Sequence, residues 1–130
     1  MTNPEHASLE QYVKLEQYVN MTELLARVDN DRELLAELFT LFHEDFPRLQ
    51  DALHSAVDSG DPLQIGKAAH TLKGMLGNLS IKQGAELAAG VEAAARDGDA
   101  LQIRQALAAF DREAAGFSAA LDVFMAGGER

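Results

Sequence analysis

The sequence contains no cysteine and no tryptophan, and aromatic residues make up only 6% of its 130 residues. The absence of cysteine excludes disulfides and thiolate metal sites and fits a reducing compartment. No stretch of roughly eighteen uncharged apolar residues occurs, so no membrane span is predicted. Residues 1–25 are polar and acidic where a signal peptide would need an apolar core. These absences favour a cytoplasmic protein that does not enter a membrane.

Positive charge is also scarce. The chain has 11 lysine and arginine residues against 21 aspartate and glutamate residues, which gives a formal net charge of −10 at pH 7. Binding to nucleic acid needs a basic surface, so this balance argues against a nucleic-acid partner. Alanine and leucine dominate the 47% of hydrophobic residues, which favours helices over strands. The length is that of one domain with its own core.

Amphipathic segments separated by turn signals fill most of the chain. Four long segments carry apolar residues at a spacing of three or four, as one buried helix face requires. These faces are Leu35, Leu38, Phe42, Phe46, Leu49, Leu53 and Ala56; Ile65, Ala69, Leu72, Leu76 and Leu79; Ile81, Ala85, Ala88 and Ala95; and Ile103, Leu107, Phe110, Ala114, Phe117, Leu121 and Phe124. Two shorter segments come first, and Thr22 is the expected N-cap of the second. The pattern predicts an all-α protein, an antiparallel four-helix bundle with one or two short N-terminal capping helices.

Three turns connect the long segments. Gly60 and Gly98 stand where a helix can end in a left-handed residue, and each is followed by an aspartate that can cap the next helix. At the turn between them, Ser80 and Gln83 have the spacing of a capping box. We therefore assign residues 1–19 to an N-terminal extension with a short helix, residues 20–126 to the bundle and residues 127–130 to a disordered tail.

One histidine lies on the outward face of the second long segment. With Leu72 at the centre of the buried face, His70 lies about 160° around the helix. Three glycines lie on the same side: Gly66, Gly74 and Gly77. Each interior glycine costs a helix roughly 1 kcal/mol relative to alanine, so three on one exposed face need a reason. Their missing side chains would let a partner approach the imidazole ring closely.

The histidine is also surrounded by positive charge. Lys67 and Lys73 lie three residues before and after it, at the spacing of neighbours on a helix. With Lys82, they are the only charged residues between Pro62 and Ala85. The lysines can hold an anion, and a neutral imidazole is a nucleophile at physiological pH. The pattern predicts a histidine that receives and gives up a phosphoryl group, with the chemistry completed by a docking partner.

Glu92, in the third long segment, is predicted to lie toward the buried side of its helix, where a carboxylate needs a partner. If this helix packs beside the one with His70, Glu92 can accept a hydrogen bond from Nδ1–H of the ring. That bond would leave Nε2 as the nucleophile. Two other readings stay open at this point: Glu92 could reach water at the edge of the core, or pair with Lys67 or Lys73.

These residues resemble the histidine-containing phosphotransfer (HPt) domain of multistep phosphorelays. The family's core motif reads AHTLKG here, at residues 69–74, and the similarity extends over residues 20–124. By position, the resemblance implies phosphorylation of His70 on Nε2, Lys73 close to the phosphoryl group and Gly74 as the glycine that lets a receiver domain dock. Family members often have glutamine or glutamate, bonded to the ring, where Glu92 stands. One departure is Ser80, where the family usually has glycine.

The resemblance implies a phosphocarrier without kinase activity of its own. It would accept a phosphoryl group from the aspartate of one response-regulator receiver domain and pass it reversibly to another. It implies no cofactor in this chain, because Mg²⁺ would be supplied by the receiver domain. The expected partners are receiver domains and a sensor or hybrid histidine kinase, and the chain is expected to be a monomer. The residues expected to contact a partner are Lys67, Gly66, Gly74, Gly77, Met75 and Lys82.

Other functions fit the same pattern in part. A noncatalytic adaptor would use the same face but would not need His70. The phosphate-accepting domain of a chemotaxis-type histidine kinase would differ mainly in its phosphoryl donor. A carboxylate-bridged metal bundle needs a glutamate three residues before a histidine, and none of the four histidines His6, His43, His54 and His70 has one. No metal is therefore expected. His6, His43 and His54 are interpreted as surface or boundary residues. No glycine-rich phosphate loop is present, which argues against an autonomous kinase.

Overall fold

The computed structural model describes residues 8–126, all of whose regular secondary structure is helical. Two short helices, α1 (Leu9–Glu16) and α2 (Met21–Arg27), precede four long ones: α3 (Arg32–Ser59), α4 (Pro62–Asn78), α5 (Lys82–Asp97) and α6 (Ala100–Ala126). The predicted all-α bundle is confirmed. The predicted disordered tail and His6 lie outside the described residues. None of the helices described is long and apolar enough to cross a membrane.

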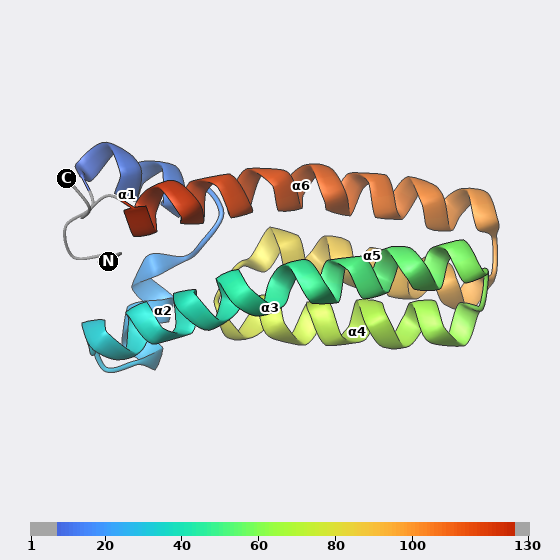
Figure 1. Cartoon of the computed structure of the whole chain (residues 1–130), viewed down its shortest axis with the longest axis horizontal. Helices are drawn as coiled ribbons and strands as arrows, with labels where there is room; N and C mark the ends of the chain where they lie inside the picture. The colour runs from blue at the N-terminus through green and yellow to red at the C-terminus, as the bar shows by residue number, and fades with distance from the viewer. Residues whose placement is uncertain (1–7, 127–130) are drawn as a thin grey trace.

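The four long helices run alternately up and down (Figure 1). Helices α3 and α4, α4 and α5, and α5 and α6 are neighbours, and α6 returns against α3 to close the bundle. Helix α1 packs against the C-terminal end of α6, where the rings of Tyr12 and Phe124 lie 6.2 Å apart. In this antiparallel order, α4 and α5 form a hairpin, and that hairpin carries the predicted site.

The glycine turns form as predicted. Gly60 and Gly98 end their helices with φ of 74° and 72°, in the left-handed region where glycine costs least. The side chain of Asp61 accepts a hydrogen bond from Leu63 N (3.0 Å), and that of Asp99 accepts one from Leu101 N (2.9 Å). Because one helix ends at each glycine and the next begins within two residues, the connection is too short for anything but an antiparallel return of the following helix.

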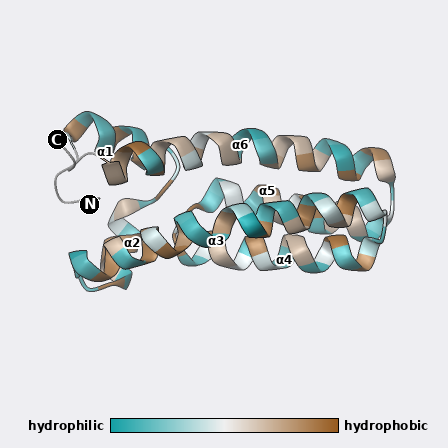
Figure 2. Cartoon of the chain, viewed as in Figure 1, coloured by the Kyte–Doolittle hydropathy of each residue, from teal (hydrophilic) through white to brown (hydrophobic). Residues whose placement is uncertain are grey.

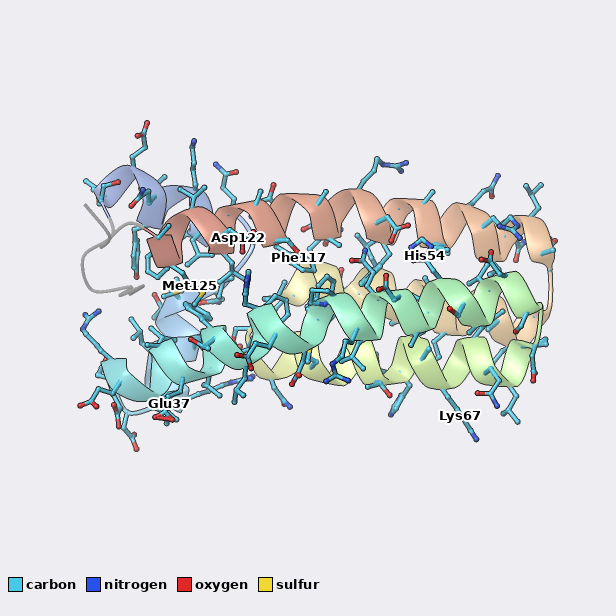
Figure 3. The ribbon with its side chains drawn as sticks, viewed as in Figure 1. Glu37, His54, Lys67, Phe117, Asp122 and Met125 are labelled. Atoms are coloured by element: carbon cyan, nitrogen blue, oxygen red, sulfur yellow. The ribbon has the colours of Figure 1, made fainter. Side chains whose placement is uncertain are left out.

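The core lies along the inner faces of the long helices. Both hydrophilic and hydrophobic colours run along each of them in Figure 2, as amphipathic helices require. The predicted faces of α4 and α6 are buried throughout. In α3 and α5 the prediction is only partly right, because Phe39 and Val57 are also buried, while four predicted positions are only half-buried: Leu38, Leu49, Ala56 and Ala85. Phe117 of α6 lies between α6 and α3 in Figure 3. The centroid of its ring lies 5.9 Å from that of Phe42 and 5.2 Å from that of Phe46. These aromatic contacts join the first and last helices of the bundle.

Two capping predictions are wrong. Helix α2 is capped by Asn20 rather than Thr22, because the Asn20 side chain accepts the hydrogen bond from Glu23 N (3.0 Å). Ser80 makes no capping box: it is a left-handed residue with φ of 58°, and Ile81 precedes α5 without a side-chain cap. The hydroxyl of Ser80 instead donates to Glu23 Oε1 at 2.7 Å. Glycine is the residue that most often adopts the left-handed conformation at such a turn, so Ser80 has the backbone conformation that is typical of glycine there.

Helix α2 is bound to the turn between α4 and α5. The backbone N–H of Asn20 donates to the carbonyl of Ser80 (2.9 Å), and Glu23 Oε2 lies 2.7 Å from the ammonium of Lys82. The guanidinium of Arg27 donates to the carbonyls of Gly77 and Asn78 (2.9 and 3.2 Å). These carbonyls lie at the C-terminal end of α4, beyond the reach of the regular helical hydrogen bonds, and that of Gly77 also accepts from the backbone N–H of Ser80 (3.1 Å). The contacts therefore hold the α4–α5 hairpin at its turn.

Candidate functional site

His70 lies on the outer face of α4, and the short turn at residues 79–81 brings α5 back beside it. The side chain of His70 is 66% exposed, whereas that of Glu92 on α5 is 19% exposed. Nδ1 of His70 lies 3.1 Å from Oε2 of Glu92. A carboxylate can only accept, so Nδ1 carries the proton in this bond. Nε2 is then the ring nitrogen with a free lone pair, as the sequence analysis expected.

The second oxygen of Glu92 is also used. The ammonium of Lys73 lies 3.1 Å from Oε1 of Glu92. The hydrogen bond to His70 and an ion pair with a lysine, which the sequence left open as alternatives for Glu92, are therefore both present. The lysine is Lys73 rather than Lys67. The hydrogen bond from Lys73 is the main reason that the pKa of Glu92 lies below its ordinary value, while partial burial opposes the shift. Glu92 is thus an ionised carboxylate that holds both His70 and Lys73.

The ring of His70 borders an open groove of about 770 Å³ between α4 and α5. The groove is lined by Pro62, Leu63, Gly66, Lys67, His70, Thr71, Glu92, Ala95 and Arg96. Gly66 and Lys67 are therefore placed beside His70, as predicted. Arg96 and Leu63 were not predicted at the site, because their position depends on the register of the hairpin. The only local signal was a basic residue in the last turn of α5.

The glycines of α4 have no packing reason inside the molecule. A Cβ atom added at Gly66, Gly74 or Gly77 would meet nothing within 4 Å. By contrast, a Cβ at Gly84 would lie 2.9 Å from a ring carbon of Phe117, and one at Gly116 would overlap the phenol of Tyr18. Close packing within the bundle therefore explains the latter two and leaves the outer face of α4 unexplained.

Two residues predicted to contact a partner lie away from the groove. Lys82 is ion-paired with Glu23 at the start of α5, about 15 Å along the helix axis from Glu92. Met75 is half-buried against the core and lines a separate hollow between α3 and α4. The structure thus does not bring Lys82 or Met75 together with His70.

The other described histidines also pair with carboxylates. Nδ1 of His43 lies 3.0 Å from Asp122, and Nε2 of His54 lies 2.9 Å from Asp111, both across the seam between α3 and α6; Figure 3 labels His54 and Asp122. His43 resembles His70 in exposing 62% of its side chain. However, no basic residue lines the hollow beside it. Residues 8–126 contain no group of three or more histidine, aspartate or glutamate residues that could hold a metal ion.

The arrangement at His70 is suited to moving an anionic group. An exposed imidazole with a fixed tautomer presents one nucleophilic nitrogen to a groove that has positive charge and open space beside it. A comparison with protein-family models matches residues 33–120 to the Hpt domain. This match includes His70, Lys73 and Glu92. No curated protein and no solved structure matches the chain.

Proposed function

Because the chain belongs to the Hpt domain family, whose members transfer phosphoryl groups through a histidine in phosphorelays, we propose that His70 is the phosphorylated residue. In this proposal, Nε2 of His70 accepts a phosphoryl group from the aspartate of one receiver domain and passes it to another. The single observation that carries the proposal is the 3.1 Å contact between Nδ1 of His70 and Glu92, which leaves Nε2 free in the groove.

The transfer step follows from this geometry. The lone pair of Nε2 attacks the phosphorus of the aspartyl phosphate, an N–P bond forms, and the bond from phosphorus to the aspartate oxygen breaks. The aspartate leaves as a carboxylate. The ring keeps its proton on Nδ1 and gains positive charge, which the carboxylate of Glu92 faces and stabilises. Attack by the carboxylate of the next receiver on the same phosphorus reverses the step and restores the neutral ring.

The remaining residues assist this chemistry. Glu92 holds Lys73 next to the ring. From there the ammonium of Lys73 can leave the carboxylate oxygen of Glu92 and bind an oxygen of the phosphoryl group. Gly74, Gly66 and Gly77 leave room on the surface of α4 for the receiver domain, which would supply Mg²⁺ from its own acidic pocket. The chain itself acts as a carrier and does not need a nucleotide site. The monomeric state and the cytoplasmic location expected from the sequence remain predictions.

The proposal is tested by phosphotransfer from phosphorylated receiver domains, read by intact-mass spectrometry. Three proteins are compared: wild type, His70→Gln and His43→Gln. The last is a matched control, because His43 is similarly exposed and also has Nδ1 bonded to a carboxylate. We expect one acid-labile phosphoryl group on wild type and on His43→Gln, and none on His70→Gln.

Other results would point elsewhere. Phosphorylation of His70→Gln would identify a different acceptor. If none of the three proteins takes a phosphoryl group from several active donors while binding to them persists, the face around His70 is only a docking surface. The noncatalytic adaptor would then be the better description.

A further inference from the structure

The positive charge around His70 is distributed differently from what the sequence indicated. Lys73 is bound to Glu92, and Lys82 is bound to Glu23. The only lysine or arginine residues that line the groove are Lys67 and Arg96. The only carboxylate in the lining is Glu92, and both of its oxygens are already engaged. The groove therefore has two cations that its own carboxylate does not neutralise.

Neither cation finds a carboxylate elsewhere in the part of the chain that the structure describes. Four of the ten lysine and arginine residues described form ion pairs there, and Lys67 and Arg96 are among the six that do not. What distinguishes these two from the other unpaired cations is that they line the groove beside His70. Lys67 points away from the bundle in Figure 3. Two exposed cations on neighbouring helices, facing one groove, are arranged to meet an anion from outside the molecule.

The two cations are displaced from the reacting nitrogen. Lys67 lies one helical turn before His70, and Arg96 lies one turn after Glu92, which is about 5 Å along each helix. Because α4 and α5 are antiparallel, both shifts are toward the same end of the bundle, the end of the Gly60 and Gly98 turns. The side chain of Leu63, 64% exposed, lies in the groove at this end. A ligand held there would lie beside the phosphoryl group rather than on it.

We propose that Lys67 and Arg96 form a recognition element for an acidic side chain on the surface of the partner receiver domain, next to its phosphoaspartate pocket. This inference rests on the proposed function. A planar guanidinium binds a carboxylate through two parallel hydrogen bonds, and the lysine adds a second charge. Such pairs act mainly on the rate of encounter and on the choice of partner. The element selects receivers that carry a carboxylate at this position over receivers that carry a neutral or basic residue there.

The test compares wild type with a double variant, Lys67→Gln with Arg96→Gln. A second double variant, Arg104→Gln with Arg112→Gln, is the matched control. It removes the same charge from exposed positions on α6, the helix diagonal to α4. For each protein, kcat/KM is measured with the phosphorylated receiver domain that donates fastest to wild type. The rate with phosphoramidate, a small donor that needs no docking surface, is measured in parallel.

We expect the first double variant to lower the ratio of receiver rate to phosphoramidate rate about tenfold at low salt, and the loss to shrink at high salt as the charges are screened. The control should keep the wild-type ratio. Changing the acidic residues around the receiver's pocket to lysine, one at a time, should find one that gives the same loss with wild type and no further loss with the variant.

Three results would overturn the inference. An equal loss in the control would mean that only net charge matters. A wild-type ratio in the first double variant would leave Arg96 with no role beyond its favourable place at the C-terminal end of α5. If wild type takes no phosphoryl group from any receiver, the proposed function itself fails, and the inference fails with it. The second result removes the inference while leaving the phosphocarrier function intact.

Discussion

Replacing the three outer glycines of α4 with alanine should make the protein more stable and less active. A Cβ at each of Gly66, Gly74 and Gly77 meets nothing within 4 Å, so the substitutions introduce no clash. Alanine is favoured over glycine in a helix interior by roughly 0.5–1 kcal/mol per residue. The triple variant should gain about 2 kcal/mol in the free energy of unfolding. For a domain of this length, that gain corresponds to a rise in Tm of about 7 °C.

The same substitution at a packed glycine should have the opposite effect. A Cβ at Gly84 would lie 2.9 Å from Phe117, and one at Gly116 would overlap Tyr18. Either ring would have to move, which typically costs about 1–3 kcal/mol in a packed site. Gly84→Ala and Gly116→Ala are therefore matched controls of identical chemistry, in helices of the same bundle, that should lower Tm.

Two assays decide the outcome. Urea unfolding followed by circular dichroism gives the stability, and transfer from a phosphorylated receiver domain gives kcat/KM. We expect the triple alanine variant to unfold later than wild type and to transfer at least tenfold more slowly, because three methyl groups would hold the receiver away from His70. A loss of stability would show that α4 packs against something that the structure does not contain. A gain in stability with wild-type transfer would refute the idea that the glycines make room for a partner.

Two further predictions concern the turn and the acidic side chains. Ser80→Ala should be less stable than Ser80→Gly by about 1 kcal/mol in chemical denaturation, since both lose the bond to Glu23 and only glycine adopts a φ of 58° without strain; equal stabilities would refute the role of the left-handed backbone. The pKa values of Glu92 and Glu23 lie below the ordinary 4.5, mainly because Lys73 and Lys82 donate hydrogen bonds to them. Their stabilising effect should be complete well above pH 4.5 and be lost as pH falls below 4.5 through the lowered pKa values, so over that fall wild type should lose more stability than Glu92→Gln. Parallel curves for the two proteins would contradict this.

The features predicted correctly from the sequence are those fixed by local chemistry. Glycine followed by aspartate ends one helix and starts the next within two residues, and this order determined the turns at Gly60 and Gly98. Helical periodicity placed the inner faces of α4 and α6 and put His70 outside. The contact of His70 with Glu92 was also within reach, since a three-residue turn leaves little freedom in how α5 returns along α4.

The features that the sequence analysis missed depend on contacts between distant segments. Ser80 and Gln83 have the spacing of a capping box, but Glu23 of α2 takes the hydroxyl of Ser80 and the ammonium of Lys82. Nothing near Lys82 in the sequence indicates that α2 lies there. Arg96 was missed for the same reason, because its place beside Lys67 needs the register of the hairpin in three dimensions. The sequence therefore indicated the reacting residue well and the distribution of charge around it less well.

Glu92 uses one oxygen for His70 and the other for Lys73, which leaves a single nitrogen of the ring available in a single groove. If that nitrogen is the carrier, the donor and the acceptor must occupy the same face in turn, and a complex of all three proteins cannot form there. Each cycle then includes one dissociation and one new encounter. A partner that bound too tightly would act as an inhibitor of the relay. The flow of phosphoryl groups would be governed by how fast partners leave and by how many of them compete for one site.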